Sequence, residues 1–268
     1  MNVLSLFDGI SCARVALGDR VASYYAAEIE PNAIKIAKKN YPDTIHLGDV
    51  RTITKDTLPP IDLLIGGSPC QDLSIAKKGR VGLEGERSGL FYEYLRIKNE
   101  VNPRWFVLEN VASMPKKDKD IISKEMGVEP IMIDASLVSA QSRKRLFWTN
   151  IPVNGLPKDK GILLKDILQD AEVDERMISN GKAYTLTSSY SKVSPSEKQI
   201  QNSINKKQRT MVIGNAGIRK LTPIECERLQ GLPDNYTEGI AMTNRYTCLG
   251  NAFNVEVIRH IVQQITMY

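Results

Sequence analysis

Short apolar runs alternate along this chain with stretches that have the apolar spacing of helices. Most of these runs end at a glycine or a polar residue. Runs of this length are typical of strands buried in a parallel sheet, and their alternation with helices predicts a doubly wound, mostly parallel α/β fold. In such a fold the functional residues lie at the carboxyl ends of the strands. The expected strands are Val3–Phe7, Val21–Ala27, Thr44–Leu47, Ile61–Ile65, Pro103–Leu108 and Pro130–Ile133.

The length and the cysteine spacing limit the class of protein. A chain of 268 residues can form one large domain or one domain with a smaller appendage. No apolar run approaches the ~20 residues that cross a bilayer, and the first residues lack the pattern of a secretory signal. The four cysteines show no Cys-x-x-Cys spacing, so we expect neither a metal site nor a disulfide framework. These features predict an intracellular, cytoplasmic protein without a membrane segment.

Positive charge is concentrated in one segment. The net charge is +5, and residues 176–220 contain nine Lys or Arg residues and one acidic residue, Glu197. A cationic segment of this kind indicates a polyanionic partner, with a solvated basic face as the alternative. Residues 178–215 are also rich in Ser, Asn, Lys and Gln and show little periodicity, except near Tyr184–Thr187. We therefore expect a catalytic domain over 1–155, a small irregular basic subdomain over 156–219, and a return to the first domain over 220–268.

Cys70 is the candidate nucleophile. It follows the run Ile61–Ile65 and the turn sequence Gly66-Gly67-Ser68-Pro69, which places it on a loop at the carboxyl end of a strand. An arbitrary cysteine is more often a small buried hydrophobe, as we expect for Cys12, Cys226 and Cys248. The residues after Cys70, up to Arg87, are rich in Gly, Lys and Arg, and this composition favours a cationic loop over a core segment.

Helix signals flank the other candidate residues. Pro31 begins a helix that we expect to end at Asn40, and Glu28, just before it, can accept hydrogen bonds from a ribose diol. Thr222, Pro223 and Glu225 have the spacing of a capping box at a helix start. An amphipathic helix is expected from Val255 to about Ile265. The first turn has no complete Gly-x-Gly-x-x-Gly, so a dinucleotide site is not indicated.

Five motifs, in order along nearly the whole chain, give a specific resemblance to the cytosine-5 DNA methyltransferases. Some stretches, such as Met132-Ile133-Asp134-Ala135, are closest to the de novo branch of that family. Two departures are that the turn after Phe7 lacks the usual Phe-x-Gly-x-Gly, and that Ile29 stands where many members have an aromatic residue. The motifs are Phe7-Asp8-Gly9, Pro69-Cys70-Gln71, Glu109-Asn110-Val111, Gln141-Ser142-Arg143-Lys144-Arg145 and Gly250-Asn251.

The resemblance implies a Rossmann-like, S-adenosylmethionine-dependent enzyme that methylates C5 of a cytosine flipped out of duplex DNA. It assigns catalysis to Cys70 as the nucleophile at C6, Glu109 at N3 and Arg145 at O2, with Arg143 as a second cation that favours the thiolate. We expect a bacterial or phage enzyme; a monomer on DNA is favoured, but the sequence does not determine the oligomeric state. The cofactor residues that the resemblance implies are Phe7, Asp8, Gly9, Ile10, Glu28, Ile29, Asp49, Val50, Pro69 and Asn251.

Contacts with DNA are expected from two regions. The loop from Leu73 to Gly89 would close over the flipped base, whose removal from the stack costs a few kcal/mol. The basic subdomain would read the sequence, with Thr185 and Thr187 on one side of a short strand. The expected contact residues are Gln71, Ser74, Lys77, Lys78, Arg80, Thr185, Thr187, Lys206, Lys207 and Arg209.

Three alternatives stay open on the sequence. A transfer-RNA cytosine-5 methyltransferase shares most of these motifs, but that branch carries a Cys-Phe-Thr motif that this chain lacks. A non-catalytic DNA-binding relative would be favoured by loss of Cys70 or Glu109, and both are present. A hydride-transferring Rossmann enzyme is disfavoured because the phosphate-binding glycines are absent. The sequence indicates neither the recognised DNA site nor whether the enzyme protects against a restriction nuclease.

Overall fold

Seven strands form the main sheet, in the order β3-β2-β1-β4-β5-β7-β6. The computed structural model describes residues 1–69 and 89–266. β7 runs antiparallel to both β5 and β6, and the other neighbouring pairs are parallel. The predicted doubly wound, mostly parallel sheet is therefore confirmed. The strands are β1 Asn2–Leu6, β2 Ser23–Ala27, β3 Ile45–Gly48, β4 Leu63–Gly67, β5 Trp105–Val111, β6 Ile131–Asp134 and β7 Lys144–Thr149.

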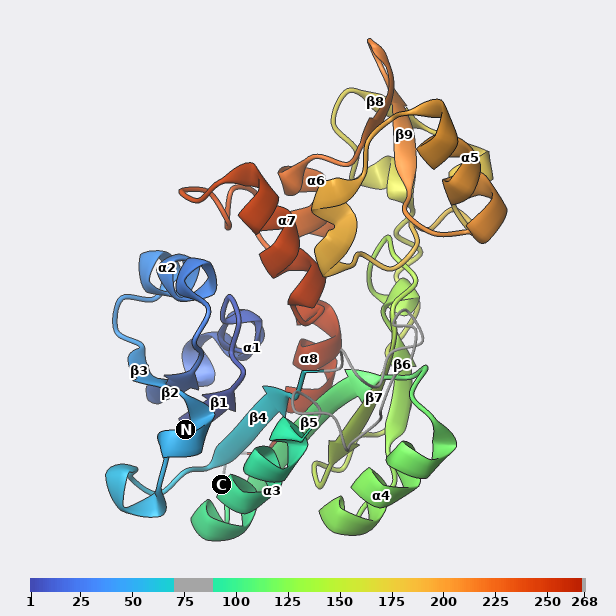
Figure 1. Ribbon diagram of the computed structural model, residues 1–268. Helices are drawn as coiled ribbons and strands as arrows, with labels where there is room; N and C mark the ends of the chain where they lie inside the picture. Colours follow the sequence, from blue (N-terminus) through green and yellow to red (C-terminus); the bar gives the residue numbers. More distant parts are fainter. Residues whose placement is uncertain (70–88, 267–268) are drawn as a thin grey trace.

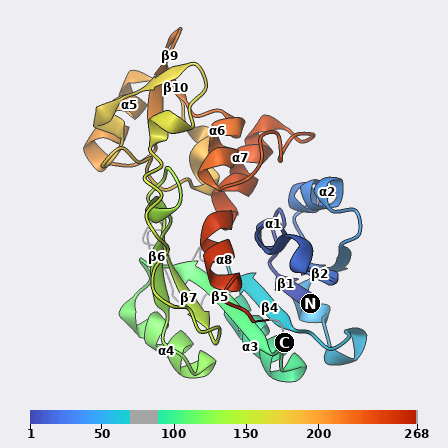
Figure 2. The same ribbon diagram turned by 180° about the vertical axis from the view of Figure 1, so that it is seen from behind.

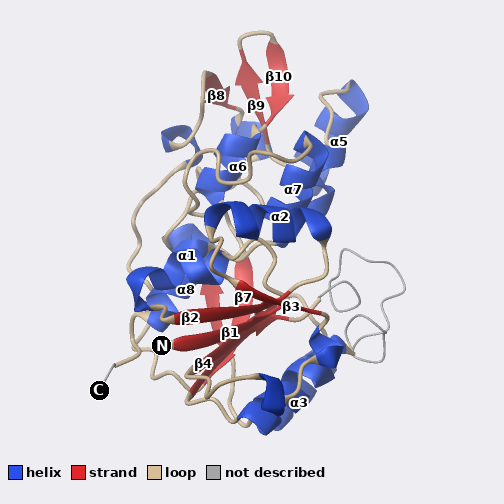
Figure 3. Ribbon diagram, turned by 90° about the vertical axis from the view of Figure 1, so that its left-hand side faces the viewer, coloured by secondary structure: helices blue, strands red, loops and turns tan. Residues whose placement is uncertain are grey.

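Helices cover both faces of this sheet (Figure 3). On one face lie α1 (Cys12–Leu17), α2 (Pro31–Asn40) and α8 (Val255–Val262), and on the other lie α3 (Leu90–Val101) and α4 (Lys116–Met126). The core therefore has two apolar layers, because successive residues of a strand point to opposite faces. Val3 belongs to the first layer and Leu4 to the second, and both are fully buried. Burial on both faces explains the uninterrupted apolar runs in the sequence.

A smaller antiparallel sheet, in the order β10-β9-β8, stands at one end of the molecule (Figures 1 and 2). Its strands are β8 Ala171–Val173, β9 Met211–Gly214 and β10 Gly217–Lys220, and α5 (Glu197–Lys206) lies beside it. Two further helices, α6 (Pro223–Leu229) and α7 (Met242–Asn251), lie between this sheet and α8. None of the helices in the described part of the chain is long and apolar enough to cross a membrane.

The basic segment is more regular than its composition predicts. The expectation of little secondary structure over 178–215 is wrong, because α5 and β9 lie inside it. The expected strand at Tyr184–Thr187 is also wrong. Residues 184–187 have no regular structure, and the isolated bridges nearby, Gln141–Ala183 and Ser179–Lys182, lie just before them.

Candidate active site

A cavity of about 410 Å³ opens at the carboxyl ends of β1, β2, β4 and β5. Parallel strands bring these ends to one edge of the sheet, which is why residues distant in sequence meet there. The lining includes all ten residues for which a cofactor role is expected, from Phe7 to Asn251. It also includes Glu109, Arg143 and Arg145, so the structure brings the ten expected cofactor residues and three of the four expected catalytic residues around one space.

The turn after β1 has a left-handed backbone at three alternate residues. Phe7, Gly9 and Ser11 have φ values of 57°, 60° and 61°. Two amides of the turn are held by the end of β2. Asp8 N donates to the Ala27 carbonyl at 3.0 Å, and Gly9 N donates to Glu28 Oε2 at 2.8 Å. These bonds fix the turn against the carboxyl end of the neighbouring strand.

Asp8 is a buried carboxyl group in the cavity wall. The Ser11 hydroxyl donates to its Oδ2 at 2.6 Å, and the Tyr24 hydroxyl donates to its Oδ1 at 2.7 Å. Burial raises the pKa of Asp8 above its usual value, and these hydrogen bonds oppose the shift only in part. These two hydrogen bonds hold the Asp8 carboxyl group in one orientation at the cavity wall.

Glu28 closes the turn at the end of β2. Its Oε1 accepts from the amides of Ile29 and Glu30, both at 2.8 Å, in addition to the bond from Gly9 to Oε2. Three backbone donors hold the carboxylate in one orientation at the cavity wall. Ile29 beside it lines the cavity and is 66% exposed.

Asp49 and Val50 follow β3 on the same edge. The Arg51 guanidinium donates to both carboxylate oxygens of Asp49, which holds the pKa of that carboxyl below its usual value. Val50 is buried and adds apolar surface to the cavity.

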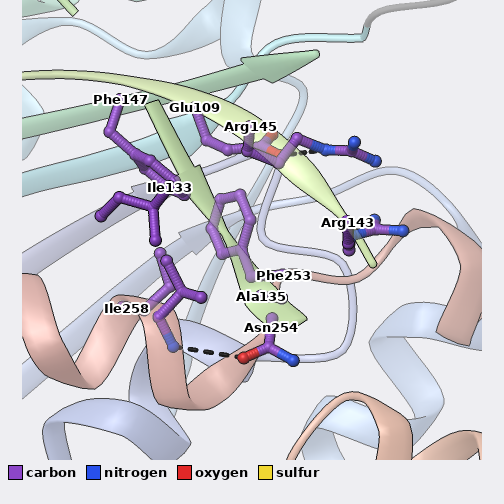
Figure 4. A pocket seen from close by; sticks show the side chains of 10 residues that line it. Glu109, Ile133, Ala135, Arg143, Arg145, Phe147, Phe253, Asn254 and Ile258 are labelled. Atoms are coloured by element: carbon purple, nitrogen blue, oxygen red, sulfur yellow. Dashed lines mark hydrogen bonds and ion pairs between the residues drawn. The ribbon is translucent and has the colours of Figure 1, made fainter. Parts of the chain in front are cut away.

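Glu109 and Arg145 form an ion pair at the end of the cavity (Figure 4), with 2.6 Å between Arg145 Nε and Glu109 Oε1. Their side chains are 13% and 15% exposed. Glu109 lies on β5 and Arg145 on β7, two neighbouring antiparallel strands. β5 continues to Val111, so Glu109, near the expected end of this strand, is held by a ladder rather than a loop.

Arg143 lies just before β7 and has different partners. Its guanidinium is buried and donates to the backbone carbonyls of Leu186, Gly250 and Ala252. Of the two arginines in the motif, Arg145 is the one that forms the ion pair with Glu109.

Three residues beside the site are missing from the expected set. Asn110 is buried, and its amide donates to the Ser68 hydroxyl at 3.2 Å, which fixes the residue before Pro69. Phe253 packs so closely on Gly67 that a Cβ there would lie 2.8 Å from the ring. The Gln141 amide nitrogen donates to the Leu229 carbonyl at 2.7 Å. Asn110 and Gln141 belong to recognised motifs, and this membership is the signal that could have identified them.

Several expected residues lie outside the described part of the chain. They are Cys70, Gln71, Ser74, Lys77, Lys78 and Arg80, together with most of the Leu73–Gly89 loop. The other three cysteines are buried, as expected, and burial raises the pKa of the Cys248 thiol to about 12.

The expected DNA contacts on the small subdomain are partly accessible. Thr187 is exposed, whereas Thr185 is half-buried and donates its hydroxyl to the Ser142 carbonyl at 2.6 Å. Lys206, Lys207 and Arg209 are all exposed at the end of α5. Lys207 and Arg209 have φ values of 49° and 63°, a left-handed backbone that is uncommon for residues other than glycine.

The family model described as C-5 cytosine-specific DNA methylase matches residues 1–152 and 157–267. The type II methyltransferase M1.ScrFI of Lactococcus lactis subsp. cremoris is 28% identical over 304 residues, which cover 98% of this chain and 77% of that protein. The orphan methyltransferase M.Rho11sI of Bacillus phage rho11s is 33% identical over 180 residues, which cover 62% of this chain and 36% of the phage protein. The solved structure of the Entamoeba histolytica methyltransferase EhMeth is similar in fold. Its TM-score is 0.72 at 16% identity, over 98% of this chain and 97% of that one.

Proposed function

Because the chain belongs to the C-5 cytosine-specific DNA methylase family, it is a DNA cytosine-5 methyltransferase, and we propose that it acts through a covalent bond between Cys70 and C6 of a flipped-out cytosine. The methyl donor is S-adenosylmethionine, and the DNA is double-stranded. One observation carries the proposal: the Glu109–Arg145 ion pair lines the same cavity as the ten residues expected to bind the cofactor.

The cavity suits S-adenosylmethionine in size and chemistry. Its volume of about 410 Å³ is in the range of small-molecule sites. Glu28 presents carboxylate oxygens to a ribose diol, and Asp8 supplies negative charge for the positively charged methionine end. Asp49, Val50, Phe7 and the exposed face of Ile29 surround the adenine. When bound, the cofactor supplies an activated methyl group.

The protein's own groups make cytosine reactive. Cytosine C5 is a weak nucleophile. Addition of the Cys70 thiolate to C6 makes C5 enamine-like and therefore more nucleophilic. Glu109 hydrogen-bonds or protonates N3 as charge moves into the ring, and Arg145 contacts the carbonyl O2. After the methyl group joins C5, loss of the C5 proton and expulsion of Cys70 restore the aromatic base. Arg145 favours the thiolate by its charge.

DNA is held between the two regions of expected contacts. The exposed cations Lys206, Lys207 and Arg209 suit phosphate oxygens, and Thr187 suits a base edge. The contacts expected from the Leu73–Gly89 loop, among them Lys77, Lys78 and Arg80, fall outside the described residues and stay a prediction. The enzyme acts as a monomer, with 156–219 as its small DNA-reading subdomain.

Bisulfite sequencing of DNA from cells that express the protein tests the activity and identifies the methylated sequence. Purified enzyme should also form a covalent adduct with a duplex that carries 5-fluorocytosine at that site, because fluorine cannot leave as a cation. Cys70→Ser should abolish both methylation and adduct, since no evident base activates a serine there. Cys226→Ser is the control, because Cys226 is buried and lies outside the cavity lining, and this variant should keep the adduct. An adduct of Cys70→Ser would overturn the assignment of the nucleophile.

A further inference from the structure

Arg143 connects its own segment, just before β7, to two segments that are distant in the sequence. Its Nη1 donates to the Leu186 carbonyl at 2.7 Å, and its Nη2 donates to the carbonyls of Ala252 and Gly250 at 2.8 and 3.2 Å. Arg143 itself is 4% exposed. These hydrogen bonds hold the guanidinium in place, because a buried carbonyl that is left without a donor is unfavourable.

The first of these segments runs beside Arg143 for several residues. Ser142 N donates to the Ala183 carbonyl at 2.9 Å, and the Thr185 hydroxyl donates back to the Ser142 carbonyl at 2.6 Å. Leu186 N donates to Gln141 Oε1 at 3.3 Å. The chain from Ala183 to Leu186 is therefore fixed to the residues that lead into β7, and Arg145 lies on that strand.

The second contact joins this segment to α7 without any side chain between them. A Cβ on Gly250 would lie 2.1 Å from the Thr187 carbonyl carbon and 2.2 Å from Ser188 N. The two backbones therefore touch, and only glycine fits. Asn251, the next residue, lines the cavity, whereas Thr187 is exposed on the side of the small subdomain.

We propose that Arg143 is a positioning residue that couples DNA binding to cofactor binding. The inference rests on the proposed function. Two backbone segments meet at Arg143: Leu186–Thr187 on the DNA side and Gly250–Ala252 on the cofactor side. Both accept hydrogen bonds from its guanidinium, and they also touch each other directly. DNA and cofactor both require the arrangement in which these carbonyls converge on Arg143. Each ligand therefore favours the arrangement that the other one binds, and each raises the affinity for the other by the same factor.

The experiment measures this factor directly. The dissociation constant of S-adenosylhomocysteine, which cannot react, is determined by calorimetry with and without a saturating duplex that contains the sequence found by bisulfite sequencing. Arg143→Met removes the donors and keeps an unbranched apolar side chain, and Arg143→Lys keeps the charge without the planar fork. Arg20→Met is the matched control, because Arg20 also donates to two carbonyls, those of Val262 and Ile265, and it lies outside the cavity lining.

We expect DNA to lower the dissociation constant of wild-type enzyme at least about 5-fold, the lower end of usual coupling factors. Arg143→Met should reduce the factor to less than about 2, Arg143→Lys should give an intermediate value, and Arg20→Met should keep the wild-type factor. Tm is measured for each variant, so that a loss of coupling in Arg143→Met can be compared with a loss of stability of similar size in the Arg20→Met control. The proposal is overturned if wild-type enzyme binds both ligands without coupling, if folded Arg143→Met keeps the full factor, or if Arg20→Met loses it equally. Failure of wild-type enzyme to bind either ligand would overturn the proposed function instead.

Discussion

The Glu109 carboxylate is mostly buried and forms an ion pair with Arg145, so its orientation is fixed before cytosine binds. Glu109→Gln keeps the shape and a hydrogen bond but removes the acid–base function. We expect DNA binding to be retained and methylation to slow by roughly 10²–10⁴-fold. Single-turnover methylation of the identified duplex measures this. Glu93→Gln is the control, because Glu93 pairs with Arg96 outside the cavity lining. A loss of less than tenfold would mean that another group serves N3.

Asp8 predicts a pH dependence of cofactor binding. Burial raises its pKa, and its ionised form is the better partner for the positively charged cofactor. Affinity should therefore be highest above the raised pKa and fall as the pH drops through it toward the usual value of 3.8. Calorimetric titration of S-adenosylmethionine between pH 8 and pH 5 measures the slope. Asp8→Asn should bind more weakly at pH 8 and show a flatter profile. An unchanged profile in that variant would remove Asp8 from the binding site.

For single residues, the sequence predicts the roles of some site residues but does not distinguish the roles of others. The family resemblance implied the ten cofactor residues, and most of them meet in one cavity because strand ends of a parallel sheet meet at one edge. Arg143 and Arg145 could not be separated by pattern, because residues two apart near a strand point the same way. Their surroundings distinguish the two arginines. Arg145 forms an ion pair with a carboxylate on β5, whereas Arg143 donates to three carbonyls of segments about 40 to 110 residues away in sequence.

At the scale of the element, α6 begins with the predicted capping box. The Glu225 amide donates to the Thr222 hydroxyl, and the Thr222 amide donates to Glu225 Oε2 at 2.7 Å. Thr222→Ala should lower the free energy of unfolding by about 1 kcal/mol, the usual cost of a lost cap. Urea unfolding followed by circular dichroism measures the change. Thr222→Ser keeps the hydroxyl, so its free energy of unfolding should fall clearly less. Equal decreases in the two variants would assign the effect to the missing methyl group.

Several elements that the sequence did not predict lie in the basic segment or beside it. α5 is polar except for Ile200 and Ile204, which pack on the core, and a stripe of two residues is too weak for a periodicity to stand out. The strands β8, β9 and β10 have three or four residues each, so alternation over them carries little information. Thr222 and Pro31 gave clear boundaries because capping and proline act locally. Tertiary contacts decide the structure of this segment.

At the scale of the whole molecule, the proposed DNA path lies between two regions, one around the main sheet and one around the small sheet. The main sheet carries the cavity, and the small sheet with α5 stands apart from it (Figure 1). α8 packs on α1, while α7 packs on residues 188–192, so the segment that holds these two helices connects the two regions. Expected boundaries at 155 and 219 remain a proposal. They imply that the small region grips DNA while the groups around the cavity carry out the chemistry.

The salt dependence of DNA binding tests that division. Lys206, Lys207 and Arg209 are exposed at the end of α5, and replacing all three with alanine should weaken binding to every duplex about equally. If each cation neutralises one phosphate, the slope of log affinity against log salt should flatten by about 0.9 for each cation removed. Fluorescence anisotropy over a series of salt concentrations measures the slope.

The control removes the same positive charge from the opposite end of the molecule, through alanine at Lys116, Lys117 and Lys124 on α4 (Figure 1). It should keep the wild-type slope, because phosphate contacts release counterions locally whereas net charge acts on all sites alike. Thr187→Ala should instead change the methylated sequence, read from a random-sequence library, since base-edge contacts specify and phosphate contacts position. If the two triple variants have equal slopes and Thr187→Ala keeps the wild-type sequence preference, the small region does not hold the DNA.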